Sequence, residues 1–249
     1  MANGEKNGDS KYVIELKNVA KHYAMGDNIV KALNGINISI ERGDFVAIMG
    51  PSGSGKSTSM NLIGSLDLAT EGNIYLDGHD IEYLEESELA QIRGNKIGFI
   101  FQQFNLIPNL TAKENIMLPM LFQGKEEEER EAKAIALLKL VELGERMDHY
   151  PNQLSGGQQQ RVAIARSLAN NPEVILADEP TGNLDTKTGE MVMNFLNKLN
   201  NEGKTIIIVT HNPELAKEHA KTIYSVKDGE IESFEKRVNG KWKNMLLKK

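Results

Sequence analysis

Nine consecutive residues of this chain could hold the phosphates of a nucleoside triphosphate. The stretch 50–58, Gly-Pro-Ser-Gly-Ser-Gly-Lys-Ser-Thr, fits the pattern G-x-x-x-x-G-K-[S/T]. Residues 45–49 form an apolar run that predicts a strand, and residues 59–63 predict the first turns of a helix. A loop between a strand and a helix start aims backbone N–H groups and the positive helix end at an anion.

The residue types within this loop indicate how a triphosphate would be held. Lys56 would reach the β- and γ-phosphates, and the hydroxyl of Ser57 would ligate Mg²⁺. A glycine-rich turn with a chance lysine is the alternative, but it leaves the flanking strand and helix unexplained. The other residues expected to contact the nucleotide are Gly50, Ser52, Gly53, Ser54, Gly55 and Thr58.

A second glycine-containing segment, 154–161, reads Leu-Ser-Gly-Gly-Gln-Gln-Gln-Arg. Ser155 and Gln158 predict a capping box at a helix start. Gly156 and Gly157 would weaken the first turn of that helix, which favours a close approach of the backbone to a phosphate. One small chain cannot wrap a single phosphate with two such sites without strain, so a second copy could offer this segment across an interface.

Carboxylates and a histidine follow two buried apolar runs, 174–177 and 206–209, which predict parallel strands. Asp178 is placed to hold Mg²⁺, directly or through water, and Glu179 to orient or deprotonate an attacking water. His211 follows the other run at the same sheet edge, where a γ-phosphate contact is expected rather than a structural role.

The elements around these residues alternate between strands and helices, which predicts an α/β fold with a mainly parallel sheet. Short strands are expected at 13–16, 36–40, 73–78 and 97–101. Helices are expected between 126 and 144 and from about 188 to 199. On the second helix, Met191, Phe195 and Leu199 are predicted to form a core-facing stripe.

Composition limits the classes of protein. The chain has 249 residues and 40% hydrophobic content, enough for one large domain or one domain with an inserted lobe. Its net charge of −6 argues against a wide nucleic-acid footprint. No apolar run is long enough to cross a bilayer, no signal peptide is expected in the polar start, and the absence of cysteine is typical of a cytosolic protein.

Together these motifs resemble the nucleotide-binding subunit of an ABC transporter, from about residue 13 to residue 232. The resemblance implies a P-loop NTPase with a mainly parallel core sheet, an N-terminal antiparallel β subdomain and an inserted α-helical subdomain. It also implies roles for residues of the remaining motifs. These are Gln102 for Mg²⁺ and the attacking water, Glu179 as the catalytic glutamate, Asp185 reaching across a dimer, His211 as the switch histidine and Tyr23 stacking on adenine.

The domain limits that follow are a disordered tail at 1–11, the ATPase domain at 12–235 with its helical subdomain at about 103–170, and a basic tail at 236–249. The resemblance implies that ATP and Mg²⁺ bind between two copies. Each ATP would lie between residues 50–58 of one copy and Ser155, Gly156, Gly157 and Gln158 of the other. The expected partners are this homodimer and an integral-membrane permease, with no nucleic acid.

Residues 97–106 and 154–166 are close to the lipoprotein-release and macrolide-export type of these ATPases, which implies export or extraction of a lipoprotein, drug or peptide. The subunit would lie in the cytoplasm on the inner face of the cell membrane. One alternative is an ATPase of the cell-division type that gates a cell-wall hydrolase through a membrane partner. Another is an ABC ATPase without a membrane partner that acts on nucleic acid or ribosomes. The sequence does not identify the transported molecule.

Overall fold

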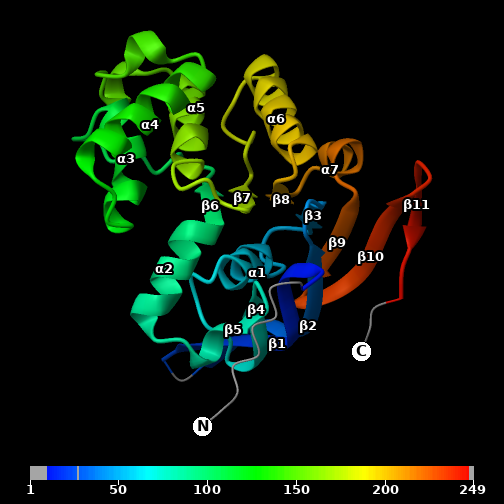
Figure 1. Cartoon of the computed structure of the whole chain (residues 1–249). Helices are drawn as coiled ribbons and strands as arrows, with labels where there is room; N and C mark the ends of the chain where they lie inside the picture. The colour runs from blue at the N-terminus through cyan, green and yellow to red at the C-terminus, as the bar shows by residue number, and fades with distance from the viewer. Residues whose placement is uncertain (1–9, 27, 247–249) are drawn as a thin grey trace. The chain divides into compact units, whose positions relative to one another are not determined.

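The computed structural model describes residues 10–26 and 28–246, and the chain forms two compact units (Figure 1). The first unit extends up to Leu89 and resumes at Val209, and the second unit is Ala90–Ile208. Most of the predicted disordered tail, 1–11, lies outside the described residues. Its last residue, Lys11, forms an ion pair with Glu41 at 3.2 Å, directly before the first strand.

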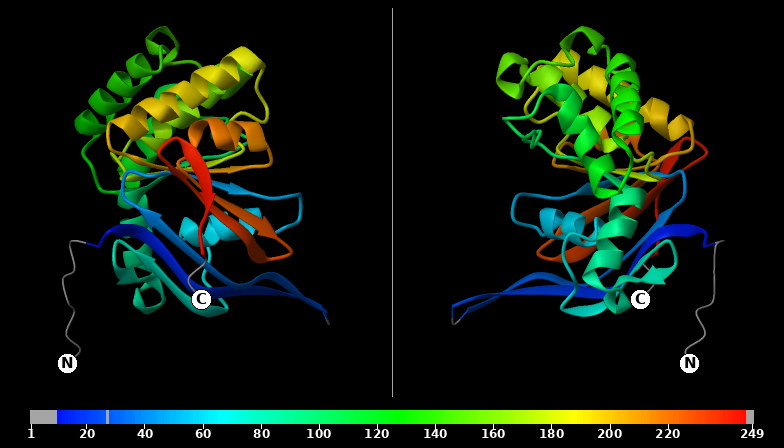
Figure 2. Two further views of the ribbon diagram at one scale, coloured as in Figure 1. Left: turned by 90° about the vertical axis from the view of Figure 1, so that its right-hand side faces the viewer. Right: turned by 60° about the vertical axis from the view of Figure 1, so that its left-hand side comes forward.

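An antiparallel sheet in the first unit has the order β2-β1-β4-β5. Its strands are β1 (Tyr12–Met25), β2 (Asn28–Glu41), β4 (Glu71–Leu76) and β5 (His79–Asp80). The first two are far longer than the apolar stretches 13–16 and 36–40 that predicted them. Both views in Figure 2 show their hairpin end projecting, where the side chains of Ile29 and Val30 are exposed. Backbone pairing continues there without core burial, so the hydrophobic pattern did not reveal it.

The first unit also contains the strand order β11-β10-β9-β3. Buried β3 (Phe45–Met49) pairs in parallel with β9 (Thr222–Lys227), which β10 (Glu230–Val238) and β11 (Lys241–Asn244) extend in antiparallel fashion. The helices α1 (Lys56–Ile63) and α7 (Pro213–His219) belong to this unit. The helix α2 (Glu86–Lys96) leads into the second unit.

The strand β10 continues past residue 235 to Val238, and β11 pairs with it. Asn239 and Gly240 connect the two strands and have φ angles of 51° and 75°. Two central residues with positive φ make the turn that best matches strand twist, and Asn-Gly favours it. Of the predicted basic tail, residues 247–249 lie outside the described residues.

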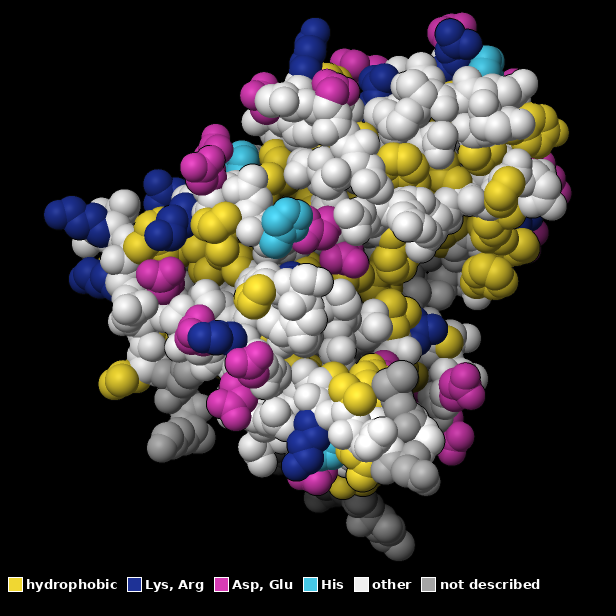
Figure 3. All heavy atoms as spheres, turned by 180° about the vertical axis from the view of Figure 1, so that it is seen from behind, with side chains coloured by type: hydrophobic (Ala, Val, Ile, Leu, Met, Phe, Trp, Pro, Cys, Tyr) yellow, Lys and Arg dark blue, Asp and Glu magenta, His cyan; other side chains and the backbone are white. Residues whose placement is uncertain are grey.

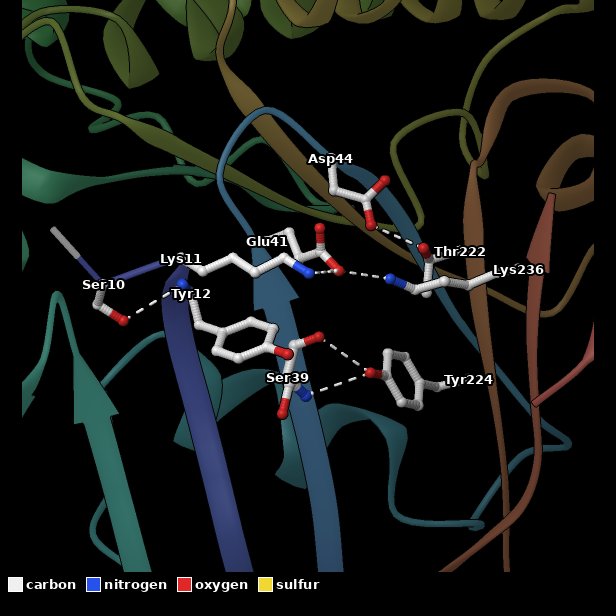
Figure 4. A network of polar contacts seen from close by, with 9 residues as sticks. All are labelled: Ser10, Lys11, Tyr12, Ser39, Glu41, Asp44, Thr222, Tyr224 and Lys236. Carbon is white, nitrogen blue, oxygen red and sulfur yellow. Dashed lines mark hydrogen bonds and ion pairs between the residues drawn. The ribbon is translucent and has the colours of Figure 1, made fainter. Parts of the chain in front are cut away.

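A polar network fixes β9 and β10 against β2 in the first unit (Figure 4). Lys236 of β10 donates to the carboxylate of Glu41 at 2.6 Å. This hydrogen bond holds the pKa of Glu41 below its usual value, against the opposing effect of burial. The hydroxyl of Tyr224 donates to the carbonyl of Ser39 at 3.0 Å, and burial raises the pKa of Tyr224 to about 12. These contacts stabilise the strand that lies beside β3.

The second unit has the strand order β8-β7-β6, and β6 (Ile97–Ile100) pairs in parallel with β7 (Val174–Asp178). The last two residues of β8 (Thr205–Thr210) fall in the first unit. The larger helices of the second unit are α3 (Ala112–Phe122), α4 (Glu127–Leu140), α5 (Gly156–Ser167) and α6 (Thr186–Asn201). Parallel strands, an antiparallel β sheet and a helical section confirm the predicted fold class.

The predicted core stripe on α6 is wrong at Met191, which is 43% exposed, and Phe195 is only half-buried. Leu199 is buried as expected. The core side of α6 is formed instead by Val192, Met193 and Leu196. The prediction chose every fourth residue, and this row drifts around a helix of 3.6 residues per turn.

Candidate functional site

The predicted phosphate loop connects buried β3 to α1 in the first unit. Gly50 begins it at φ 156°, and a Cβ there would lie 2.1 Å from the carbonyl oxygen of Val226, so the close approach to β9 requires glycine. Gly55 precedes α1 in a left-handed conformation and provides no side-chain cap. The first turn of α1 also contains no acidic residue, so the positive helix end is not compensated locally.

Side chains of this loop are arranged for an anion. The Nζ atom of Lys56 donates to the carbonyl of Pro51 at 2.7 Å, which places the cation over the loop. Ser52, Gly53 and Ser57 are exposed, and Thr58 is half-buried. Ser54 is buried, and its Oγ has no hydrogen-bond partner among the described residues. Backbone amides, a lysine and a serine hydroxyl together fit a triphosphate with Mg²⁺.

Two other predicted residues lie in the first unit. Tyr23 is half-buried near the end of β1, and its hydroxyl donates to Asp67 at 3.0 Å. His211 directly follows β8 and is exposed. Its neighbour Asn212 caps α7 by accepting from the backbone N–H groups of Glu214 and Leu215.

In the second unit, Asp178 ends β7 and Glu179 follows it, and both are half-buried. Glu179 has a φ of 44°, which is uncommon for a residue with a side chain. Its carbonyl accepts from the N–H of Gly182 at 2.9 Å, and this turn sustains the left-handed conformation. Strain of this kind is found where the surrounding structure must aim a side chain.

The structure brings Gln102 close to the turn that follows Glu179. Gln102 lies just beyond β6, which is parallel to β7, so both segments leave the same edge of the sheet. The side chain of Asn183 donates to the carbonyl of Gln102 at 2.8 Å. A Cβ at Gly182 would lie 3.0 Å from the Nε2 atom of Gln102.

The predicted capping box at α5 is confirmed. The N–H of Gln158 donates to the Oγ atom of Ser155 at 3.3 Å, and the N–H of Ser155 donates to the Oε1 atom of Gln158 at 2.9 Å. Gly157 lies against α6, since a Cβ there would approach Thr188 Cγ2 to 2.8 Å, whereas Gly156 has more room. The glycine pair thus allows close packing as well as backbone access to a ligand.

One hollow of about 340 Å³ in the second unit gathers several predicted residues. Its lining includes Ser155, Gly156, Gly157, Gln158, Asn183 and Asp185. Asp185 also caps α6, because its carboxylate accepts from the N–H of Thr188 at 3.0 Å and from the hydroxyl at 2.6 Å. The hydrogen bond from the Thr188 hydroxyl is the main reason that the pKa of Asp185 is lowered.

Two residues of α5 that are not among the predicted site residues hold the neighbouring loops. Arg166 donates to the carbonyls of Phe104 and Asn105, which both have positive φ and follow Gln102 closely. The Nε2 atom of Gln160 donates to the carbonyl of Pro180 at 2.9 Å. Gln160 is buried, and its Oε1 atom has no partner among the described residues. These contacts join partners 20 and 61–62 residues apart, so no local sequence pattern indicates them.

The Gln160→Leu substitution is expected to slow ATP turnover without weakening ATP binding. It removes the donor that holds Pro180, the neighbour of Glu179, and a misplaced reacting group costs up to about 100-fold in rate. We therefore expect kcat to decrease about 10- to 100-fold, while the Kd for ATP stays unchanged. Leucine is of similar size, but the buried carbonyl of Pro180 loses its donor, so the free energy of unfolding should also fall by about 1–3 kcal/mol.

Gln159→Leu is the matched control, because Gln159 is the adjacent glutamine and donates to Leu154 instead. Steady-state ATPase assays and nucleotide titrations compare the two variants. Equal kcat values for them would show that the contact with Pro180 does not position the turn.

Two features are absent from the part of the chain that the structure describes. None of its helices is long and apolar enough to cross a membrane. Within residues 10–26 and 28–246, no three His, Asp or Glu side chains gather into a metal cluster. Mg²⁺ at a nucleotide needs only one or two protein ligands, since phosphates and waters supply the others.

Comparisons with known proteins agree on one family. The ABC transporter family model matches residues 33–182. The uncharacterized ABC transporter ATP-binding protein MJ0796 of Methanocaldococcus jannaschii is 57% identical over 90% of this chain and 97% of its own length. The macrolide export ATP-binding/permease protein MacB of Bdellovibrio bacteriovorus is 52% identical over 90% of this chain, which spans 34% of that relative.

Solved structures give the same result. A dimeric, post-hydrolysis structure of the ATP-binding cassette MJ0796 bound to ADP and Pi has a TM-score of 0.83 and 54% identity. It covers 90% of this chain and 98% of its own. CbiO1 from Clostridium perfringens, part of the transporter complex cbiONQ, has a TM-score of 0.79 and 28% identity over 90% of this chain.

Proposed function

The chain belongs to the ABC transporter family, and we propose that it is the ATP-hydrolysing subunit that powers a separate membrane permease. The observation that carries this proposal is the loop 50–58, whose uncapped helix start and lysine form a site for a triphosphate. The name of the relative MacB, a macrolide export ATP-binding/permease protein, supports export as the direction of transport. The subunit would then act on the cytoplasmic face of the membrane.

Within the first unit, Lys56 exchanges its hydrogen bond with Pro51 for contacts with the β- and γ-phosphates. The backbone of Gly53, Ser54 and Gly55 surrounds the phosphates. Tyr23 stacks on the adenine ring, and Ser57 is a ligand of the metal. Mg²⁺ held there would neutralise the negative charge that develops on the phosphates during hydrolysis.

In the second unit, Glu179 orients and deprotonates the attacking water, and the strained turn after β7 keeps its carboxylate in place. Asp178 and Gln102 hold the metal and the water. His211, which directly follows β8 and belongs to the first unit, contacts the γ-phosphate. The place of each side chain shortly after a strand end supports these proposed roles.

Dimerisation completes the ATP site. The hollow at the start of α5 presents the N–H groups of Gly156 and Gly157 and the hydroxyl of Ser155 to the γ-phosphate held by a second copy. ADP lacks that phosphate, so hydrolysis removes these contacts and favours separation of the two copies. The dimeric structure of MJ0796 supports the assembly of two copies.

The helical section of the second unit offers a surface for the permease. Leu121 and Phe122, at the end of α3, are 48% and 74% exposed. Figure 3 shows hydrophobic side chains gathered over the helical part of the molecule, on the face seen from behind. Large exposed apolar side chains that lie together are typical of protein–protein contacts.

Affinity purification tests the proposed function. We expect the tagged protein, taken from detergent-solubilised native membranes with Mg-ATP, to retain a polytopic permease with a large extracytoplasmic domain. Phe122→Ser should release this partner and leave the ATPase activity of the isolated subunit unchanged. The measurement is quantitative mass spectrometry of the bound proteins beside a steady-state ATPase assay.

Tyr83→Ser is the matched control, because Tyr83 is also a strongly exposed aromatic residue but lies in the first unit. It should keep the permease. Ribosomal or DNA-bound proteins without a membrane partner would contradict the proposal, and a partner tied to a cell-wall hydrolase would replace transport with a regulatory role.

A further inference from the structure

Tyr23 is held at both its hydroxyl and its ring by two charged residues. Its hydroxyl donates to the Oδ2 atom of Asp67 at 3.0 Å, and the Nζ atom of Lys21 donates to the Oδ1 atom at 2.6 Å. The same Nζ lies 5.0 Å from the centre of the Tyr23 ring, within cation–π range. Each of the three side chains therefore contacts the other two.

The segment that contains Asp67 is fastened to β1 by its backbone as well. Lys21 donates to the carbonyl of Leu68 at 2.8 Å, and the N–H of Thr70 donates to the carbonyl of Ala20 at 2.8 Å. The N–H of His22 donates to the hydroxyl of Thr70 at 3.0 Å. The position of Asp67 relative to Tyr23 is thus fixed by several bonds and does not depend on one flexible side chain.

Asp67 is also connected to the phosphate loop through α1. The loop leads into the start of this helix, and the helix ends at Ile63, four residues before Asp67. Leu66 N–H returns to the carbonyl of Asn61 at 2.8 Å, which fixes the chain after the helix. The side chain of Thr58, the last residue of the phosphate loop, opposes the rise in the pKa of Tyr23 that burial causes.

The side chains are sufficiently shielded for these contacts to matter. The side chain of Lys21 is only 14% exposed although it is charged. Burial tends to raise the pKa of the Asp67 carboxyl, but hydrogen bonds from Lys21 and Tyr23 hold it below its usual value. Burial also raises the pKa of the Tyr23 hydroxyl, so it remains a donor at neutral pH. The adjoining hairpin end, with Ile29 and Val30 exposed, has little core packing to hold the ring.

We propose that Asp67 and Lys21 are positioning residues that fix the Tyr23 ring for stacking on the nucleotide base. The inference rests on the proposed function, because it assumes that ATP occupies the phosphate loop. Asp67 ties the residue that contacts the base to the helix that holds the phosphates. The base and the phosphates of the nucleotide would therefore be bound at a fixed separation.

Binding of two ligands, ATP and inorganic tripolyphosphate, tests this role by calorimetry. Both ligands contact the phosphate loop, but only ATP has a base, so the ratio of their Kd values isolates the contribution of stacking. Any effect of the altered charge on the triphosphate largely cancels in this ratio. We expect Asp67→Ala to weaken ATP binding about 3- to 10-fold, because the ring would no longer be held for stacking on the base. Tripolyphosphate binding should change less than about twofold.

Three further variants sharpen the test. Tyr23→Phe keeps the ring but loses the hydroxyl. Adding it to Asp67→Ala should cause no further loss of ATP affinity, because both substitutions remove the same hydrogen bond. Asp67→Asn keeps an acceptor and should largely restore the ratio. Lys17→Met is the matched control, since Lys17 lies over Tyr75 at 4.4 Å in the same strand; its ratio should equal that of the unmodified chain.

The possible failures are distinguishable. If the unmodified chain binds ATP and Asp67→Ala leaves the ratio unchanged, the positioning role is overturned and the proposed function stands. The same conclusion follows if the effects of Asp67→Ala and Tyr23→Phe simply add. If the unmodified chain binds neither ligand, the proposed function fails and the inference fails with it.

Discussion

Glu179→Gln is expected to bind ATP normally, to hydrolyse it about 1,000-fold more slowly and to remain a dimer in the presence of Mg-ATP. The amide has the size of the carboxylate and keeps the turn at φ 44°, but it cannot take a proton from water. Because hydrolysis normally removes the γ-phosphate contacts, the ATP-bound dimer should persist. Single-turnover hydrolysis measures the rate, and light scattering after size exclusion measures the mass.

Glu173→Gln is the control for this prediction. Glu173 lies directly before β7, at the strand end opposite Glu179, and pairs with Lys96 at 3.4 Å. Its variant should hydrolyse ATP at the rate of the unmodified chain and should not accumulate a dimer. Rapid turnover by Glu179→Gln would remove Glu179 from the role of general base.

Lys56→Ala is expected to abolish useful ATP binding. Hydrogen bonds to charged groups contribute about 1.5–3 kcal/mol each, which corresponds to a loss of about 10- to 150-fold in affinity for a single contact. The loop itself should stay folded, because Lys56 donates only to Pro51 in it while Gly229 fixes Ser54 through the backbone. Calorimetric titration with ATP gives the affinity, and thermal unfolding without nucleotide reports on the fold.

Lys221→Ala serves as the comparison, since Lys221 also donates to a backbone carbonyl, that of Gly43, but near the amino end of β3. It should bind ATP as the unmodified chain does. An unchanged ATP affinity in Lys56→Ala would refute the phosphate contact.

Local patterns predicted the parts of the fold and site that depend on short-range chemistry. The loop 50–58 lies between a buried strand and a helix start. This could be predicted because glycine conformations and apolar runs are local properties. The capping box of Ser155 and Gln158 involves residues three positions apart. Asp178 and Glu179 follow their strand as expected, because the end of a buried apolar run is visible in the sequence.

Other features depend on contacts between distant segments, and the sequence showed them less well. The hairpin end of β1 and β2 is exposed, so no hydrophobic alternation reveals its pairing. Asn239-Gly240 is a local turn signal that would have revealed β11, had it been combined with the strand before it. The contact of Gln160 with Pro180 spans 20 residues, and that of Tyr23 with Asp67 spans 44. Only the folded chain brings these partners together.

The strand β11 has a consequence for the behaviour of the protein in concentrated solution. It lies at the edge of its sheet, has four residues, and contains Lys241 and Lys243. A short edge strand with lysines discourages another chain from adding to the sheet. A chain shortened to end at Val238 would leave the nine-residue β10 as the edge, a longer template for intermolecular pairing. The hairpin of β10 and β11 is therefore expected to limit aggregation of the subunit before it binds its membrane partner.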